Sequence, residues 1–446
     1  MNLLIKNASV INEGQIKNLD VLIKNGLIEK IAPVIDNLPF NALEIKAEGL
    51  FMMPGVIDDQ VHFREPGLTH KACIATEARA AVVGGTTSFM EMPNTVPNTL
   101  TQKLLQEKYD RAQQTSLANY SFFMGVSNDN IEEVLRTDKK TVCGLKIFMG
   151  SSTGNMLVDN EKVLTHIFSE ADLLIATHCE QEARVRARFA EFEATYGAEI
   201  PVWAHPLIRD EEACLMSSRF AAELARKHNT RLHILHISTL DELALFSNAL
   251  PLKDKRITAE VCVHHLWFSA DDYARLGSQI KCNPAVKASK HKEELFKALL
   301  DNRLDIIATD HAPHTWAEKQ NKAYKDVPSG VPLVQHSLYA MLDFYKQGKI
   351  SLEKIAEKMC HAVADCFQIE KRGYIREGYF ADLVLFDIKK NHTVSKENLH
   401  YHCAWSPFEG HTFGSEITHT IVSGHLAYAN GVLNENQKGQ RLTFSR

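Results

Sequence analysis

The stretch GVIDDQVHFREPG, residues 55–67, joins a short apolar run to a charged segment that ends in a Pro-Gly turn. Seven later runs resemble its first part, and segments with helical periodicity separate them. Strand and helix alternating eight times predicts an α/β fold of the (β/α)8 TIM-type barrel class, although an open doubly wound sheet would alternate in much the same way. The eight runs are residues 55–63, 86–93, 120–126, 143–150, 173–179, 231–238, 256–263 and 305–311.

Both ends of the chain differ from this middle part, because short alternating stretches with Gly and Asn turns replace the helical segments. Residues 3–33 show this pattern, and it returns after residue 373. The pattern predicts antiparallel strands. We therefore expect a small β-sandwich domain built from both termini, residues 1–51 and 373–446, beside a barrel over residues 52–372.

Length, charge and cysteine content limit the classes of function. The chain has 446 residues, and its net charge of −5 gives no electrostatic reason to expect nucleic acid or a membrane surface as a partner. We expect no secretory signal and no membrane-spanning helix, because no apolar stretch reaches about 18 residues. Nine scattered cysteines predict a cytoplasmic protein with reduced thiols. Cys143, Cys179 and Cys262 are expected to be buried rather than nucleophilic.

Four of the apolar runs end in a residue that can bind a metal ion. His62, His178, His236 and Asp310 end the first, fifth, sixth and eighth runs, and the active sites of such barrels lie at the C-terminal ends of the strands. Any one of these residues is more often structural, but four strand ends together favour a metal centre. Lys146 in the fourth run adds to this interpretation, because a buried lysine is costly unless it is neutralised or paired.

Three further histidines receive other interpretations. His233 precedes His236 by three residues, so on a strand its side chain points to the opposite face, and we expect it to be structural. His264 and His265 are expected either to support metal ligands or to pack in the interior. The sequence does not separate these two roles.

Eight motifs, spread over nearly the whole chain, resemble dihydroorotase, which belongs to the amidohydrolase superfamily of metal-dependent barrels. The combination of HFREPG with ATDHAPH is the specific part, since either motif alone would indicate only a cyclic amidohydrolase. The motifs are PGVIDDQVHFREPGLTHK (54–71), MEMPNT (90–95), GLKIFM (144–149), HILHIST (233–239), TAEVCVHHLWFS (258–269), KCNPAVK (281–287), IATDHAPHTWAEK (307–319) and PSGVPLVQ (328–335).

The resemblance implies a zinc centre and a mechanism. Similar enzymes hold two zinc ions bridged by a lysine that is carboxylated on its amine, and Lys146 matches this lysine. His178 and His236 match the ligands of one metal, and His62 and Asp310 match ligands of the other. A metal-activated hydroxide would attack the ring amide, with Asp310 as the general acid and base.

The resemblance also implies a substrate, a small molecule. The reaction would be the reversible cyclisation of N-carbamoyl-L-aspartate to L-dihydroorotate in de novo pyrimidine biosynthesis. Arg64 and Asn94 match residues that bind the substrate carboxylate, and His314 matches a further contact to it. Asn283 and the backbone around Gly330 match positions that hold the ring.

Two more expectations and one alternative follow. The stretch 150–156 could form a mobile loop over the substrate, with Thr153 as a donor. By analogy with the family, a homodimer is plausible.

The nearest alternative is an enzyme that opens the ring of allantoin or hydantoin. Arg64 argues against this alternative, because those substrates carry no carboxylate for its guanidinium to bind.

Gln60 departs from the family pattern, in which histidine stands at this position. A carboxamide oxygen is a poorer zinc ligand than an imidazole nitrogen. Gln60 could nevertheless ligate a second metal, or that metal could be weakly held, or the chain could be a catalytically silent partner of aspartate transcarbamoylase. The last outcome is disfavoured because the other site residues remain. Ligand chemistry favours one tight zinc at Lys146, His178 and His236 with a weaker second site.

Overall fold

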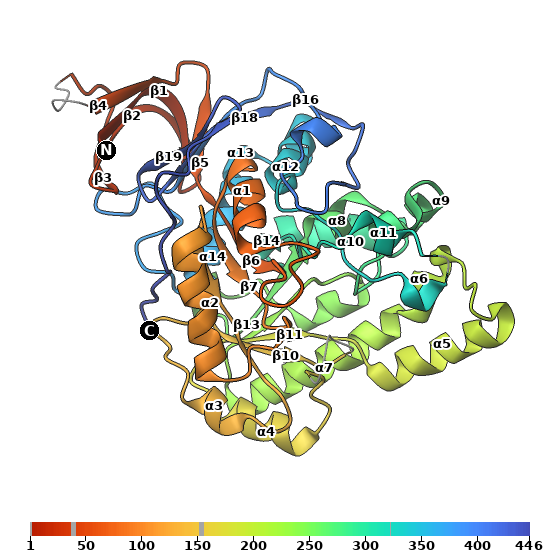
Figure 1. The fold of residues 1–446 in the computed structure, drawn as a ribbon. Helices are drawn as coiled ribbons and strands as arrows, with labels where there is room; N and C mark the ends of the chain where they lie inside the picture. The colour runs from red at the N-terminus through yellow and green to blue at the C-terminus, as the bar shows by residue number, and fades with distance from the viewer. Residues whose placement is uncertain (1, 37–41, 151–155, 322) are drawn as a thin grey trace.

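The structure is a computed structural model that describes residues 2–36, 42–150, 156–321 and 323–446. Each of the eight apolar runs forms a parallel strand in it, which confirms the predicted barrel (Figure 1). The third run is divided into two short strands, β8 and β9. The strands are β6 (Val56–Val61), β7 (Thr86–Glu91), β8 (Asn119–Phe122), β9 (Met124–Gly125), β10 (Leu145–Phe148), β11 (Ile175–His178), β12 (Leu232–Ile234), β13 (Ile257–Cys262) and β14 (Ile306–Ala308).

The barrel closes between its first and last strands. Strands β6 to β8 form one parallel sheet and β9 to β14 form a second. The ring is completed where the His62 amide donates to the His311 carbonyl at 2.7 Å and Val61 pairs with His311 in parallel. Closure of this kind excludes the open doubly wound sheet, and it brings the C-terminal ends of all strands to one face.

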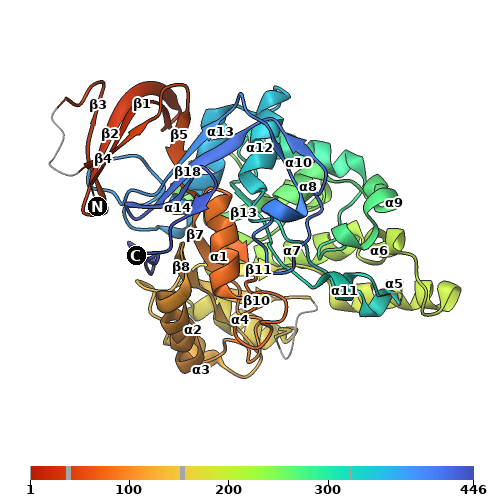
Figure 2. The ribbon, with the colours of Figure 1, turned by 45° about the horizontal axis from the view of Figure 1, so that its top comes forward.

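A second layer of strands comes from both ends of the chain and corresponds to the predicted β unit. Figures 1 and 2 show the N-terminal strands, in red, beside β18, in blue. Strand β5 joins the two parts, since it pairs in parallel with β1 and antiparallel with β15. The sheet contains β1 (Asn2–Asn12), β2 (Gln15–Lys24), β3 (Leu27–Ala32), β4 (Ala42–Lys46), β5 (Phe51–Pro54), β15 (Leu383–Asp387), β18 (Glu416–Val422), β19 (His425–Ala429) and β20 (Val432–Leu433). The exact domain limits stay a prediction.

Helices lie between the barrel strands, and α7 illustrates how the sequence sets their ends. Asp210 begins α7, because its side chain accepts a hydrogen bond from the Ala213 amide, and Asn229 ends it in the left-handed conformation. Among the described helices, none is both long and apolar enough to cross a bilayer. The longer helices are α1 (Ile74–Val83), α2 (Gln102–Thr115), α4 (Glu161–Glu170), α5 (Glu182–Tyr196), α7 (Glu211–His228), α10 (Ser289–Leu300) and α12 (Ser337–Lys346).

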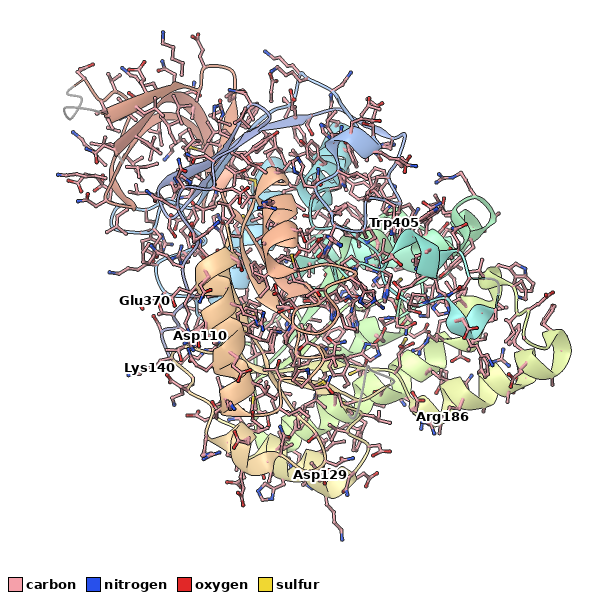
Figure 3. The ribbon with its side chains drawn as sticks, in the orientation of Figure 1. Asp110, Asp129, Lys140, Arg186, Glu370 and Trp405 are labelled. Atoms are coloured by element: carbon pink, nitrogen blue, oxygen red, sulfur yellow. The ribbon has the colours of Figure 1, made fainter. Side chains whose placement is uncertain are left out.

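Short helices and strands complete the loops of the fold, some of them on the C-terminal face of the barrel. Trp405, labelled in Figure 3, illustrates how distant segments support this face, because its indole N–H donates to the His314 carbonyl at 2.8 Å. The short helices are α3 (Ile131–Leu135), α6 (His205–Ile208), α8 (Val263–Trp267), α9 (Tyr273–Leu276), α11 (Trp316–Lys319), α13 (Leu352–Ala356) and α14 (Ala362–Phe367), and the remaining strands are β16 (His392–Thr393) and β17 (Thr412–Phe413).

Candidate active site

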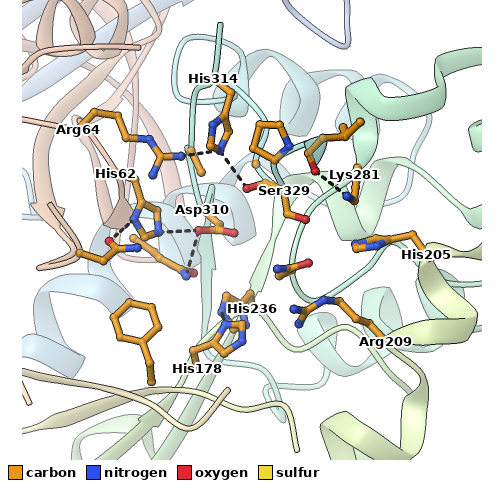
Figure 4. A pocket seen from close by; sticks show the side chains of 18 of the residues that line it. His62, Arg64, His178, His205, Arg209, His236, Lys281, Asp310, His314 and Ser329 are labelled. Atoms are coloured by element: carbon orange, nitrogen blue, oxygen red, sulfur yellow. Dashed lines mark hydrogen bonds and ion pairs between the residues drawn. The ribbon is translucent and has the colours of Figure 1, made fainter. Parts of the chain in front are cut away.

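A cavity of about 390 Å³ opens at the C-terminal ends of the barrel strands. All the predicted site residues that the structure describes line this cavity, and Figure 4 shows how the side chains of six of them converge, namely His62, Arg64, His178, His236, Asp310 and His314. Thr153 lies outside the described residues. The predicted residues that line the cavity are Gln60, His62, Arg64, Asn94, Lys146, His178, His236, Asn283, Asp310, His314 and Gly330.

His62 and Asp310 form the first pair of metal-competent residues. His62 Nδ1 lies 2.8 Å from Asn94 Oδ1, and His62 Nε2 lies 3.1 Å from Asp310 Oδ1. Because an amide oxygen can only accept, Nδ1 carries the proton and Nε2 turns its lone pair toward the carboxylate. Burial lowers the pKa of His62, although Asp310 acts in the opposite direction. A neutral imidazole nitrogen facing a carboxylate oxygen is an arrangement that a cation would bridge.

Gln60 contacts the same carboxylate, but with its amide nitrogen. Gln60 Nε2 donates to Asp310 Oδ1 at 3.3 Å, whereas Gln60 Oε1 lies 3.6 Å from the sulfur of Cys262. The side chain therefore presents an N–H, not an oxygen, to the space beside His62. Both contacts of Asp310 converge on Oδ1, so Oδ2 remains for other partners.

His178 and His236 form the second pair. His178 Nδ1 lies 2.9 Å from His236 Nε2, and His178 Nε2 lies 3.0 Å from Glu180 Oε2. His236 Nδ1 has no hydrogen-bond partner among the described residues, although only 2% of the residue is exposed. A histidine whose far nitrogen contacts a carboxylate is typical of zinc ligands. Burial raises the pKa of Glu180, but Arg209 and His178 outweigh it and hold the pKa at about 2, so Glu180 is ionised.

Lys146 lies on β10 next to both pairs. Its side chain is buried, and its amine lies 4.5 Å above the centre of the Phe148 ring. Burial lowers the pKa of Lys146 to about 7, while Asp310 and Glu260 act to raise it. The amine is therefore neutral in a large share of molecules near pH 7. The lowered pKa of Lys146 is what the sequence led us to expect, because a buried lysine is costly unless it is neutralised or paired.

Arg64 and His314 occupy another wall of the cavity. Arg64 Nε donates to the Pro313 carbonyl at 3.0 Å, and Arg64 Nη2 lies 3.1 Å from His314 Nε2. Burial lowers the pKa of Arg64 to about 10, so the guanidinium stays charged at neutral pH. Glu65 could have paired with Arg64, but it contacts Arg111 at 3.2 Å instead. The charge of Arg64 is thus directed toward the cavity.

A group of basic residues around the opposite wall was not predicted from the sequence: His205, Arg209 and Lys281 line the cavity there. Lys281 Nζ donates to the carbonyls of Tyr324 and Val327 at 2.7 and 2.6 Å. The buried Lys319 Nζ donates to three further carbonyls, those of Lys281, Pro328 and Gly330. These two lysines hold the segment 324–330, which lines the cavity. The sequence indicated a role for Lys281 and Lys319 only in that they lie in the KCNPAVK and IATDHAPHTWAEK motifs.

His233 lies outside the lining of the cavity. Its Nε2 lies 3.1 Å from Glu260 Oε2 and 3.4 Å from Asp59 Oδ2, inside the barrel. Glu260 Oε1 accepts the backbone N–H of His236 at 3.0 Å. His233 thus belongs to a buried network beneath His236, in keeping with the structural role expected from its strand position.

The donor set of the cavity fits zinc. It offers imidazoles, one carboxylate and a buried amine, which becomes an anionic oxygen ligand if it is carboxylated. Burial and the neighbouring His178 and Lys146 hold the pKa of His236 well below its usual range, so the ring is in the neutral form that binds metal. The unpartnered Nδ1 of His236 supports the same conclusion.

Comparison with known proteins places these features in a family. The amidohydrolase family model matches residues 51–427. A dihydroorotase from Carboxydothermus hydrogenoformans is 33% identical over 96% of this chain and 98% of its own length. An allantoinase from Bacillus velezensis is 30% identical over 99% of this chain and 97% of its own length.

Solved structures show a similar architecture. The L-hydantoinase (dihydropyrimidinase) from Arthrobacter aurescens superimposes with a TM-score of 0.93 and 25% sequence identity, and the match covers 99% of both chains. In sequence or in architecture, the chain is thus similar to enzymes named for three different cyclic amides.

Proposed function

From the premise that the chain belongs to the amidohydrolase family and is a hydrolase of cyclic amides, we propose that it interconverts L-dihydroorotate and N-carbamoyl-L-aspartate. The reaction would be the ring-closing step of pyrimidine biosynthesis, as the resemblance to dihydroorotases implies. The observation that carries the choice among cyclic amides is Arg64.

Arg64 supports a substrate with a carboxylate. Its guanidinium is buried and charged, and Glu65 contacts Arg111 instead of Arg64. His314 Nε2 lies 3.1 Å from Arg64 Nη2. A planar guanidinium binds a carboxylate through two hydrogen bonds. Dihydroorotate carries one carboxylate on its ring, whereas allantoin and hydantoin carry none, so a buried unpaired cation would be unfavourable in an enzyme for either of them.

We propose zinc as the cofactor, with Lys146, His178 and His236 as the tight site. His62 and Asp310 would hold a second ion more weakly, since Gln60 turns its N–H rather than its oxygen toward Asp310. Zinc bound there would supply Lewis acidity toward the ring carbonyl and toward water.

Lys146 can become a zinc ligand through its neutral amine. The nitrogen lone pair would form a bond to the carbon of CO2 while one C=O π bond opens onto its oxygen, and the nitrogen would lose a proton. This step turns the buried amine into an anionic carbamate with two oxygen donors, and a bound cation would offset the cost of burying its charge. The lowered pKa of Lys146, about 7, supports this role because the protonated amine does not react.

Asp310 would move the proton. Gln60 donates to its Oδ1, which also faces His62, so Oδ2 can take a proton from the attacking water and give it to the ring nitrogen as the C–N bond breaks. In the direction of ring closure, Asp310 would take the proton from the carbamoyl nitrogen. Asn94 and Asn283 would orient the substrate beside it.

A substrate panel tests this proposal. Purified protein would be assayed with dihydroorotate, N-carbamoyl-aspartate, allantoin and hydantoin, before and after chelation and after zinc is restored. We expect turnover of the first two compounds, loss on chelation and recovery with zinc. Faster turnover of allantoin or hydantoin would identify a different cyclic amidohydrolase. A folded protein inactive on all four that co-purifies with aspartate transcarbamoylase would indicate the silent partner.

A further inference from the structure

A second cluster of possible metal ligands lies behind the wall of the cavity, at the junction of β13 and α8. Cys262 ends β13, and His264 and His265 lie in the short helix that follows. One donor atom from each of the three side chains lies within 4.8 Å of the other two. All three residues are buried, and none of them lines the cavity. We propose that they form a thiolate-containing metal site, here called the Cys262 site, separate from the proposed zinc centre.

His265 has the proton arrangement of a metal ligand. Its Nε2 lies 3.1 Å from the carbonyl oxygen of Pro284, and a carbonyl can only accept, so Nε2 carries the proton. The lone pair is then on Nδ1, which has no hydrogen-bond partner among the described residues. A backbone carbonyl on the far nitrogen is a common support for a histidine that binds a metal.

His264 supports the same inference more strongly. Only 1% of the residue is exposed, and neither ring nitrogen has a hydrogen-bond partner of ordinary geometry within the described part of the chain. Apart from a contact with the Thr309 backbone, an imidazole buried in this way loses its bonds to water, which is unfavourable. A metal ion bound to one nitrogen would remove much of this cost.

Gln60 connects the Cys262 site to the cavity. Its Oε1 lies 3.6 Å from the Cys262 sulfur, while its Nε2 donates to Asp310 on the other side. The carboxamide oxygen is therefore well placed to be the fourth donor, beside one sulfur and two nitrogens. Such a donor set suits Zn²⁺, or Co²⁺ as its spectroscopic substitute.

A comparison with the other cluster of this kind shows what distinguishes the Cys262 site. Asp59, His233 and Glu260 also place donor atoms within 4.8 Å of one another. There, however, His233 uses both nitrogens, since Nδ1 lies 2.8 Å from Thr258 Oγ1 and Nε2 contacts the two carboxylates. The imidazole of that group is therefore already engaged on both sides, although the Asp59 oxygens have no hydrogen-bond partner among the described residues, whereas the two imidazoles of the Cys262 site keep unpartnered nitrogens.

The place of the Cys262 site suggests a structural role for its metal. His265 is tied to the loop at Pro284, which follows the cavity residue Asn283, and Gln60 is tied to Asp310. A metal ion would therefore join β13, this loop and β6 behind the substrate without touching the substrate.

Cobalt spectroscopy tests the Cys262 site independently of activity. The chain would be stripped of metal with a chelator, dialysed and titrated with CoCl2. A sulfur ligand gives cobalt a near-ultraviolet charge-transfer band, and the residues proposed for the zinc centre include no sulfur. We expect this band in the wild-type protein, its loss in Cys262→Ser, and one equivalent less bound cobalt in that variant.

Matched variants locate the band and separate it from the proposed function. Cys143→Ser and Cys179→Ser alter other buried thiols and should keep the band, and Lys146→Ala should keep it while losing the zinc centre. Absence of the band in folded wild-type protein overturns the inference whatever the variants do. Persistence of the band in Cys262→Ser also overturns it. Neither result bears on dihydroorotate turnover, which is measured separately.

Discussion

At the scale of single residues, three cavity side chains share an unusual backbone. Arg64, His236 and Asp310 have φ angles of 69°, 42° and 49°, a region that residues other than glycine enter at a cost of about 1–2 kcal/mol. Each lies just after a barrel strand, where the turn directs the side chain into the cavity. No pattern of residue types predicts this conformation. The sequence could therefore identify these residues but not the direction of their side chains.

Arg64 offers the most direct test of the substrate. Replacing it in Arg64→Gln removes a charged hydrogen bond of about 2 kcal/mol, so kcat/KM for dihydroorotate should fall about 30-fold or more. In Arg64→Lys, kcat/KM for dihydroorotate should fall somewhat less, because the positive charge remains. Arg111→Gln, on an exposed arginine, should leave the steady-state kinetics unchanged. An Arg64→Gln variant with normal kcat/KM would contradict carboxylate binding by this residue.

Gln60 provides a test of metal count. We expect Cys262→Ser protein to retain one zinc after gel filtration, and Cys262→Ser/Gln60→His to retain two, because imidazole restores a strong ligand beside His62. The Cys262→Ser background excludes zinc at the Cys262 site from the count. Elemental analysis of both proteins gives the numbers. Two zinc ions in the single variant would show that Gln60 does not weaken the second site.

Lys146 should make reconstitution depend on pH and CO2. Its pKa is lowered to about 7, so the reactive neutral amine is the minor form below pH 7 and the major form above it. Activity regained by metal-free protein with zinc, at a fixed concentration of dissolved CO2, should therefore rise about eightfold in initial rate from pH 5.5 to 6.5 and level off above pH 8. A rate that is independent of CO2 would argue against carboxylation.

At the scale of elements, the sequence predicted the strands well because each is a short apolar run with a clear end. All eight runs became barrel strands, and the charged residues at their ends came together in the cavity. Apolar patterns do not fix helix ends, because these depend on single capping residues. Helix α7, for example, begins at Glu211 because Asp210 caps its first turn.

The segment 324–330 could not be placed from sequence, since its position depends on contacts that are remote along the chain. Lys319→Met should weaken it, because three carbonyls would each lose a hydrogen-bond donor. We expect faster hydrogen exchange in this segment and a fall in kcat/KM of about tenfold or more. Lys290→Met, on an exposed lysine, is the control. Unchanged exchange would show that Lys319 does not hold the segment.

At the scale of the whole molecule, the C-terminal segment supports the end of the barrel that is remote from the cavity. Phe444 pairs with Ile369, Arg441 pairs with Tyr120 of β8, and Leu442 is fully buried. Residues close to one terminus thus contact the barrel core directly. Sequence periodicity could not show this, because the segment is too short to have a pattern of its own.

Leu442→Ala should accordingly destabilise the whole fold. Truncating a buried leucine lowers the free energy of unfolding by about 2–5 kcal/mol. Thr443→Ala, at the exposed neighbouring position, should have an effect below about 1 kcal/mol. Thermal or urea unfolding of the two variants would measure the difference. Equal stability would mean that the segment is not part of the cooperative unit.

The double pairing of β5 has a consequence for synthesis of the chain. One edge of β5 bonds to β1, which the ribosome makes early, and the other bonds to β15, at residues 383–387, which it makes late. Throughout the translation of the barrel, the second edge of β5 therefore lacks its partner and is open to pairing with another nascent chain. Both edges of β5 are paired only after β15 has left the ribosome.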